Sequence, residues 1–164
     1  MCWRLTNKQF EAQKGAANRC AFEQIVRGGE EPGILCYRGD EPIGWCAIAP
    51  RSKYPRLGRS RVLAAVDEQQ VWSITCFFVA KPYRREGVSV ALLRAAVEHA
   101  RNSGAQIVEG YPVEPKKGDM PDPFVWTGLA SAYRATGFTE VVRRSETRPI
   151  MRLCLQSPNA LSST

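Results

Sequence analysis

Residues 71–111 restrict the fold of this chain more than any other segment. The stretch VWSITCFFVA at 71–80 is rich in β-branched and aromatic residues, which predicts a strand buried on both faces. Apolar residues recur at helical spacing over 88–103, and Gly104 supplies the helix stop. A second strand, AQIVEGYPV, begins directly afterwards and is expected to pair over 105–111. The order strand, helix, strand predicts a crossover unit whose two strands are parallel.

The segments on either side of this unit predict further helices and strands. Residues 7–27 carry apolar side chains at three- and four-residue steps, which predicts one or two helices ending at Gly28 and Gly29. Residues 33–50 contain two short apolar runs around a polar turn, the pattern of a β-hairpin. After the crossover, the sequence predicts a loop at 114–123, a helix at 124–136 that Gly137 ends, and strands at 138–144 and 148–155. The element order is that of a mixed α/β fold.

Length and composition predict one soluble domain over residues 1–155. The chain has 164 residues, of which 44% are hydrophobic and 24% charged, as in ordinary globular proteins. The tail at 156–164 has little to bury and is expected to be disordered. No apolar run approaches the roughly 20 residues that a membrane helix needs, and no signal-peptide pattern is visible, so a cytoplasmic location is expected.

The cysteines and the net charge limit the kinds of ligand. None of the six cysteines has the close spacing of a metal or redox motif, so they are interpreted as small buried hydrophobes, and no metal site is expected. The formal net charge of +7 favours an anionic partner, which could be nucleic acid, an acidic substrate or a phosphorylated cofactor. The aromatic-and-glycine signature of an RNA-binding sheet is missing, which makes nucleic acid the least favoured of the three.

The joint before the central helix, KPYRREG at 81–87, has the features of an anion site. The first N–H groups of a helix have no intrahelical partners and carry partial positive charge. Gly87 lets a ligand approach the backbone, Ser89 is small, and Arg84 and Arg85 add full charges. The joint also lies at the C-terminal end of a parallel strand, where open sheets bind ligands. These features predict a pyrophosphate site, although a solvated turn with a helix cap would give a similar pattern.

Two motifs in this region resemble those of the GNAT superfamily of N-acetyltransferases. RREGVS, at 84–89, resembles the family's Gln/Arg-x-x-Gly-x-Gly/Ala loop, with the strand ITCFFVA before it and a helix after it. Ser89 departs mildly from the family's Gly or Ala, and keeps the small size needed there. The second motif, AYRATGF at 132–138, places a tyrosine a few residues before a Gly-Phe pair, as the family often does. The resemblance covers roughly residues 30–154.

The resemblance implies a mixed, mostly antiparallel sheet with the parallel strand-helix-strand unit at its centre and helices around it. The family usually has a strand and a helix before the segment matched here. The opening residues MCWRLTNKQF leave no room for that strand, so the family's first strand and first helix are expected to be absent. An uncovered sheet edge is a route to association, and a homodimer is therefore expected.

The resemblance also implies binding of acetyl-CoA and direct transfer of its acetyl group to a primary amine. The backbone of the strand at 77–79 would pair with the pantetheine arm as if the arm were an added strand. The N–H groups of residues 85–90 would hold the pyrophosphate, with Arg84 beside it. The implied cofactor-binding residues are Phe77, Phe78, Val79, Arg84, Arg85, Glu86, Gly87, Val88, Ser89 and Val90. A non-catalytic acyl-CoA-binding or regulatory module of the same fold is the alternative.

Two residues are candidates for proton transfer in that reaction. The resemblance makes Tyr133 the acid that protonates the departing thiolate, and the alternative is that its ring packs against the sheet. Glu109, a carboxylate within an apolar strand, is the candidate base, because some relatives that acetylate protein N-termini have a glutamate at the matching place. Its alternative is an ion pair with an arginine.

The acceptor is expected to be a small-molecule or peptide amine, but the sequence does not identify it. The segment at 50–70 carries five basic residues and is expected to lie near the acceptor end of the cleft. It therefore favours an acceptor with a carboxylate or phosphate over a polycationic aminoglycoside. Trp45, Trp72 and Trp126 could line an acceptor pocket or belong to the core.

Overall fold

The computed structural model describes residues 1–116 and 125–155. The predicted disordered tail and most of the loop predicted at 114–123 lie outside these residues. The helices are α1 (Asn7–Ala12), α2 (Ala16–Arg27), α3 (Pro55–Gly58), α4 (Val88–Asn102) and α5 (Ala130–Arg134), and short 3-10 turns span Arg51–Lys53 and Lys81–Tyr83. The strands are β1 (Gly33–Arg38), β2 (Glu41–Pro50), β3 (Trp72–Val79), β4 (Ile107–Gly110), β5 (Thr139–Arg143) and β6 (Pro149–Cys154).

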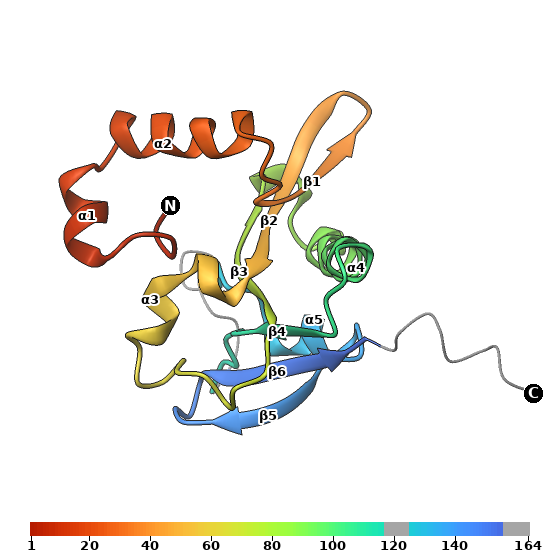
Figure 1. Ribbon diagram of the computed structural model, residues 1–164. Coiled ribbons are helices and arrows are strands. Elements are labelled where there is room, and N and C mark those ends of the chain that lie inside the picture. The colour runs from red at the N-terminus through yellow and green to blue at the C-terminus, as the bar shows by residue number, and fades with distance from the viewer. Residues whose placement is uncertain (117–124, 156–164) are drawn as a thin grey trace, which may run out of the picture.

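The strands form one six-stranded sheet in the order β1-β2-β3-β4-β6-β5 (Figure 1). β3 and β4 are parallel, and each of the other neighbouring pairs is antiparallel. The helix α4 connects β3 to β4, so the predicted crossover is confirmed, as is the mixed, mostly antiparallel fold. Residues 1–32 form α1 and α2 and contain no strand, which leaves β1 at the edge of the sheet.

The parallel pairing of β3 with β4 is short, and this opens the sheet. It runs from Trp72 opposite Val108 to Ile74 opposite Gly110. β3 continues to Val79, whereas β4 ends at Gly110. The second half of β3 is therefore paired with β2 only. In the described residues, no strand pairs with its other edge, on the side of β4.

Helices cover both faces of the first three strands (Figure 1). α4 buries an apolar stripe of Leu92, Leu93, Ala96, Val97 and Ala100 in the main core. Because strand side chains alternate between faces, Gly44 is turned toward α4, where an added Cβ would lie 3.1 Å from Leu92, and its neighbour Trp45 is turned to the other face. α1 and α2 lie on that other face.

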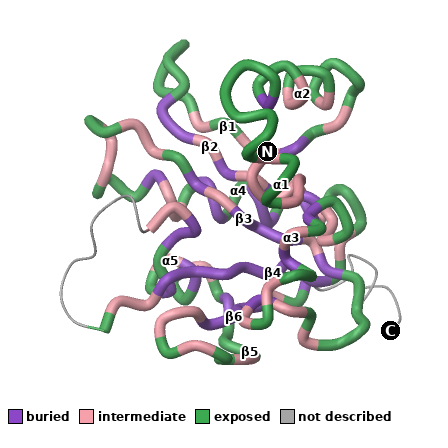
Figure 2. The backbone as a smooth tube through the Cα atoms, turned by 90° about the vertical axis from the view of Figure 1, so that its left-hand side faces the viewer, coloured by how far each residue is buried: buried purple, intermediate pink, exposed green. Residues whose placement is uncertain are grey.

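Burial is concentrated in the sheet and not in the N-terminal helices (Figure 2). All four residues of β4 are buried, whereas α1 has no buried residue and α2 has one, Asn18. A second apolar cluster joins Tyr54, Leu57 and Leu63 to the sheet residues Tyr111 and Ile150. None of the helices in the described parts of the chain is long and apolar enough to span a membrane.

The last helix is shorter than the sequence predicted. It was expected over 124–136, but α5 begins at Ala130. Before it, Leu129 forms a bridge with Val113, and Gly128 has a φ of +84°, so the preceding residues are held outside the helix. The basic segment at 50–70 contains a 3-10 turn and the single-turn helix α3.

Candidate functional site

A groove of about 420 Å³ lies beside the edge of β3 that β4 leaves uncovered. One wall comes from the end of β3, one from the start of α4, and one from the residues before α5. Of the residues predicted to bind cofactor, all but Glu86 and Val90 line it. The complete lining is Phe77, Phe78, Val79, Tyr83, Arg84, Arg85, Gly87, Val88, Ser89, Pro115, Val125, Trp126, Gly128 and Leu129. The structure thus brings the two predicted segments, 77–79 and 84–89, to one place.

The N-terminal end of α4 is open to a ligand. Gly87 is the N-cap residue, with a φ of +78° that favours glycine, and no side chain caps this end. A Cβ built on Gly87 would meet no atom within 4 Å. Arg85 has a φ of +66° and is the only non-glycine residue with a positive φ in the described chain, so the loop is held in a demanding conformation. The macrodipole of the 15-residue helix adds positive potential here.

Side chains of the β1–β2 hairpin fix the loop that leads into α4. Arg38 forms a 2.6 Å ion pair with Glu86 and lies over the Tyr83 ring, 4.6 Å from its centroid. The Tyr83 hydroxyl donates a hydrogen bond to Glu41 Oε2 at 2.7 Å. The negative charge of Glu86 is therefore balanced by Arg38.

The edge of β3 that was predicted to pair with a cofactor arm is hydrogen-bonded to the segment before α5. Phe77 N–H donates to the carbonyl of Trp126 at 2.6 Å. The residues after Trp126 are tied to Val113, whose N–H donates to Gly128 O at 2.8 Å. At the end of the strand, Arg84 Nε donates to Val79 O at 3.0 Å. A cofactor arm on this edge would have to replace the contact with Trp126.

Tyr133 lies under the groove and does not line it. Its side chain is fully buried, and its hydroxyl donates to Thr127 O at 3.4 Å. The ring packs edge-on against Phe77, with centroids 6.2 Å apart, and fills the space beside Gly110, where β4 ends. Burial raises the pKa of Tyr133 well above its ordinary value. The structure therefore shows the packing alternative, and a role as the acid stays a prediction that requires the hydroxyl to reach the groove.

Glu109 is held in a buried network of charges. Its Oε1 accepts hydrogen bonds from Arg51 at 3.1 Å and from the Tyr111 hydroxyl at 2.6 Å. Its Oε2 accepts from Arg152 Nε at 2.7 Å. Arg152 also binds Asp67 through both of its terminal nitrogens. Burial, and then the charge of Glu109, raises the pKa of Tyr111, which keeps its hydroxyl a donor.

This network corresponds to the ion-pair alternative for Glu109. Both carboxylate oxygens are occupied, the side chain has no exposed surface, and Glu109 lines neither the groove nor the neighbouring cavities. Its role as a catalytic base remains a prediction without a geometric path to the groove.

A second and larger cavity adjoins the groove on the face covered by α1 and α2. Its volume is about 760 Å³, and its lining includes Phe78 and Trp126, which also line the groove. Trp45 and Trp126, two of the three predicted pocket tryptophans, are part of it. The sequence reasoning missed the aromatic residues Trp3, Phe10 and Phe22, whose only signal was their position in a polar N-terminal segment.

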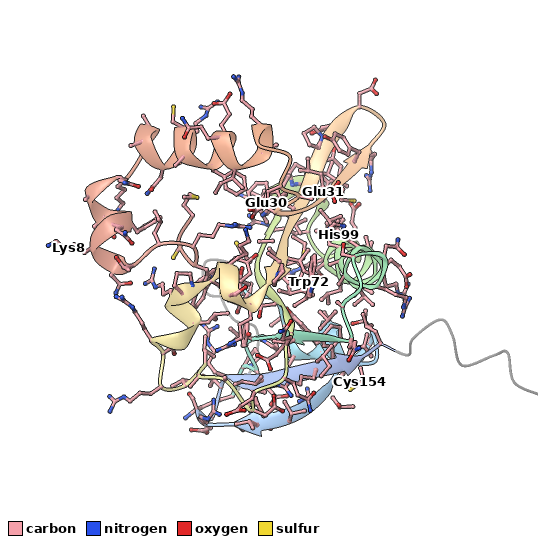
Figure 3. All side chains as sticks on the ribbon, viewed as in Figure 1. Lys8, Glu30, Glu31, Trp72, His99 and Cys154 are labelled. Atoms are coloured by element: carbon pink, nitrogen blue, oxygen red, sulfur yellow. The ribbon has the colours of Figure 1, made fainter. Side chains whose placement is uncertain are left out.

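Trp72 and the only histidine lie elsewhere. Figure 3 shows His99 beside Trp72 and close to Glu30 and Glu31, at the end of α4 opposite to the groove. The rings of Trp72 and His99 meet edge-on, with centroids 5.6 Å apart, and line a small polar cavity of about 200 Å³. In the described residues, no group of three or more His, Cys, Asp or Glu side chains is placed to hold a metal ion.

Comparison with solved structures finds chains with a similar fold. The NatC complex bound to Gag peptide and CoA contains one with 12% identity and a TM-score of 0.54, covering 84% of this chain and 79% of that one. Ribosomal-protein-alanine N-acetyltransferase from Brucella melitensis has 17% identity, coverage of 84% and 76%, and a TM-score of 0.52. The Salmonella typhimurium protein yncA, solved with its cofactor acetyl-CoA, has 14% identity, coverage of 85% and 73%, and a TM-score of 0.52.

A family model extends the likeness from the fold to the sequence. A search of curated proteins finds no match. The model of the acetyltransferase (GNAT) family matches residues 1–114, which is more than half of the chain. The match includes α1 and α2, which the motif resemblance over 30–154 left out, and it contains the β3–α4 joint with its open helix end. With this match and the six-stranded sheet described above, the chain belongs to the GNAT acetyltransferase family.

Proposed function

We propose that this protein transfers the acetyl group of acetyl-CoA directly to a primary amine. The observation that carries the proposal is the groove, which joins an uncapped helix N-terminus to the uncovered edge of a strand. The first feature suits a pyrophosphate and the second suits an amide-containing arm. Few small molecules other than coenzyme A and its thioesters carry both groups in one chain.

The cofactor would lie along the groove from α4 to the parting of β3 and β4. Its pyrophosphate would meet the N–H groups around Gly87 and Ser89 and the side chains of Arg84 and Arg85. Its pantetheine arm would take the hydrogen bond that Phe77 N–H now donates to Trp126. The thioester would then lie near Phe78, where the groove meets the larger cavity.

The reaction requires a neutral amine, a stabilised oxyanion and a proton for the leaving thiolate. The amine nitrogen attacks the thioester carbon, the carbon–sulfur bond breaks, the nitrogen releases one proton and the thiolate takes one up, so the products are an amide and the free thiol of CoA. Tyr133 is proposed as the donor, since its ring touches Phe77, and it would become accessible when residues 125–129 give way to the arm. Because both oxygens of Glu109 are hydrogen-bonded, we propose that the amine arrives neutral or loses its proton to water.

Calorimetry with CoA tests the cofactor site. Gly87→Glu places a carboxylate at the phosphate position and is expected to weaken CoA binding by at least tenfold. Gly104→Glu is the matched control, because Gly104 also has a positive φ, of +82°, and open space around it, but lies at the other end of α4. The control is expected to keep the wild-type affinity. Equal affinities for wild type and Gly87→Glu would contradict the assignment.

Turnover separates an enzyme from a binding module. The release of CoA thiol is followed with acetyl-CoA and a panel of primary amines. An enzyme releases thiol in proportion to acetylated amine, whereas a non-catalytic acyl-CoA-binding module binds the cofactor and releases thiol with none of them.

The edge strand β1 supports a further proposal, a homodimer. Leu35 and Tyr37 on this strand are exposed to 50% and 54%. Light scattering measures the mass in solution, and a mass of one chain at all concentrations would rule the dimer out.

A further inference from the structure

The larger cavity has walls made mainly of aromatic rings. It lies between the sheet and the N-terminal segment, and six aromatic side chains line it together with Tyr54. Two pairs of these rings are in contact, with Trp3 stacked on Trp126 at 5.6 Å and Phe22 edge-on to Trp45 at 6.0 Å. The complete lining is Met1, Cys2, Trp3, Arg4, Phe10, Asn18, Arg19, Phe22, Pro32, Trp45, Ala47, Tyr54, Thr75, Cys76, Phe78 and Trp126.

The cavity and the cofactor groove share a wall. Of the residues that the structure describes, Phe78 and Trp126 line both. Phe78 is 57% exposed, although it is a large apolar side chain on a central strand. A molecule in the cavity would therefore meet the thioester beside Phe78, where the wall between the cavity and the groove ends.

The charges around the cavity are positive. Among the described residues, Arg4 and Arg19 are the charged side chains in its lining, and none of the described lining residues is an aspartate or glutamate. Arg4 is balanced in part, because its Nη1 forms a 2.5 Å ion pair with Glu30. A polycation would meet no opposite charge among these residues, and burial and the arginines favour the neutral form of a single bound amine. The α-amino group of Met1 shows this effect, since burial first, and Arg4 to a smaller extent, lower its pKa.

Polar atoms at the cavity walls are left without partners. Trp3 Nε1, Arg4 Nη2 and Asn18 Oδ1 belong to residues that line the cavity, and these atoms are buried and make no hydrogen bond with any described residue. Burial raises the pKa of Tyr54 to about 12, and hydrogen bonds with Thr75 and Arg4 offset part of that rise. Buried polar groups without partners are costly, so a rearrangement of these side chains around a ligand would be favoured where it supplies the missing bonds.

We propose that this cavity is the acceptor site and that it selects a primary amine carried on a bulky apolar group, such as an aryl ring. The inference rests on the proposed acetyl transfer and adds to it the class of acceptor. Its volume of about 760 Å³ lies within the usual range for small-molecule sites, roughly 300–1,000 Å³. A free arylalkylamine and a peptide whose first residue is aromatic both carry this chemistry.

Binding in the cavity can be measured without the cofactor. Trp3, Trp45 and Trp126 are in its walls, so phenethylamine is expected to change the tryptophan fluorescence in a saturable way, and putrescine is not. Ala47→Phe, which fills the cavity from β2, is expected to raise the Kd for phenethylamine at least tenfold. Ala95→Phe makes the same change on an exposed position of α4 and is expected to leave the Kd unchanged. Equal Kd values for these two variants, or tighter binding of putrescine, would overturn the proposal.

A charge reversal tests selectivity even if Ala47→Phe does not fold. Arg19→Glu puts a carboxylate into the lining and is expected to change the ratio of kcat/KM for phenethylamine over putrescine by about tenfold in favour of putrescine. Arg27→Glu changes the net charge equally on the same helix, outside the cavity, and is expected to keep the wild-type ratio. An identical ratio in both variants would show that the cavity does not select the acceptor.

Comparison of kcat/KM values also distinguishes the two sources of the amine. It shows as well whether the cavity proposal or the acetyl-transfer proposal has failed. A higher kcat/KM for phenethylamine identifies a small amine, and a higher value for the tripeptide Phe-Ala-Ala identifies a peptide N-terminus. Transfer to putrescine but to neither aromatic acceptor overturns the cavity proposal and leaves acetyl transfer intact. Failure to bind CoA overturns acetyl transfer, whereas the fluorescence measurement still decides whether the cavity takes an aromatic amine.

Discussion

Replacement of Glu109 by glutamine is expected to destabilise the protein strongly, because it removes one charge from a closed network. In the wild type, Glu109 balances Arg51 and Arg152, and its side chain is fully buried. Glutamine has nearly the same shape, so the change is one of charge and not of packing. The two arginines would then face a neutral amide in place of a carboxylate that has no exposed surface.

The size of the expected loss in stability depends on the partners that each arginine retains in the variant. Loss of one partner from a buried ion pair costs about 3–5 kcal/mol. Arg152 keeps Asp67, at 2.6 and 3.1 Å, and Arg51 keeps the carbonyl of Leu63 at 2.7 Å. Because these partners remain, we expect a loss of stability at the lower end of that range, about 3 kcal/mol. For a chain of this size this corresponds to a fall in Tm of roughly 6–12 °C.

Urea unfolding, followed by tryptophan fluorescence, measures this loss. Glu140→Gln is the control, because Glu140 is also paired with arginines but lies on the exposed strand β5, and its loss is expected to stay below about 1 kcal/mol. A loss below about 1 kcal/mol for Glu109→Gln as well would refute the reasoning, since it would mean that the network contributes no more than a surface pair.

The same variant separates stability from catalysis. Turnover is measured with one acceptor throughout, at a temperature where both proteins are folded, and is divided by the folded fraction. A purely structural Glu109 leaves the rate per folded molecule and the acidic limb of the pH profile unchanged. A catalytic base lowers the rate and flattens that limb.

Three further predictions concern the parting of β3 and β4 and the outer end of the network. Tyr133→Phe is expected to lower turnover by roughly 10²–10⁴ with little change in CoA affinity if the hydroxyl donates the proton, and turnover within a factor of two of wild type would leave it a packing residue. Gly110→Ala is expected to destabilise by about 1–3 kcal/mol in thermal unfolding, because its Cβ would lie 2.0 Å from the Tyr133 ring, and an unchanged Tm would contradict that packing. Arg152 lowers the pKa of Asp67 from its ordinary 3.8, so the stability that Asp67 contributes is present above pH 3.8 and is lost as the pH falls further. Asp67→Asn is therefore expected to be less stable than wild type at neutral pH and equally stable at the lowest pH, which unfolding measured over a range of acid pH values checks.

The sequence predicted those parts of the fold whose determinants are local. The helix α4 follows from a run of apolar residues at one spacing, with glycines at its two ends, and the hairpin follows from two apolar runs around a turn. The start of α5 could not be predicted in this way. Among residues 125–129 only Leu129 is a good helix former, and it pairs with Val113, a contact that depends on tertiary structure.

The same distinction between local and tertiary determinants applies to the candidate site. The groove was predictable because its cofactor residues are contiguous, and a helix N-terminus is positive wherever it occurs. The partners of Glu109 were not, because Arg51 and Arg152 are 58 and 43 residues away in sequence. Arg152 lies opposite Glu109 in the pairing of β4 with β6, and Arg51 reaches it from the turn after β2. The basic segment at 50–70 likewise suggested an acidic acceptor, but Arg51 and Lys53 form ion pairs within the chain. The aromatic cavity joins Trp3 to Trp126, a contact that no local pattern shows.

Trp126 belongs to both proposed ligand sites, with its backbone carbonyl in the groove and its ring in the aromatic cavity. Its carbonyl accepts a hydrogen bond from Phe77 in the groove, and its ring is stacked on Trp3 in the cavity. A ligand that displaces the carbonyl also shifts the ring, so the binding free energies at the two sites are linked. Linkage is reciprocal: the factor by which CoA changes the Kd of an aromatic amine must equal the factor by which that amine changes the Kd of CoA. Any such coupling between the two proposed substrates would pass through a residue that takes no part in the chemistry.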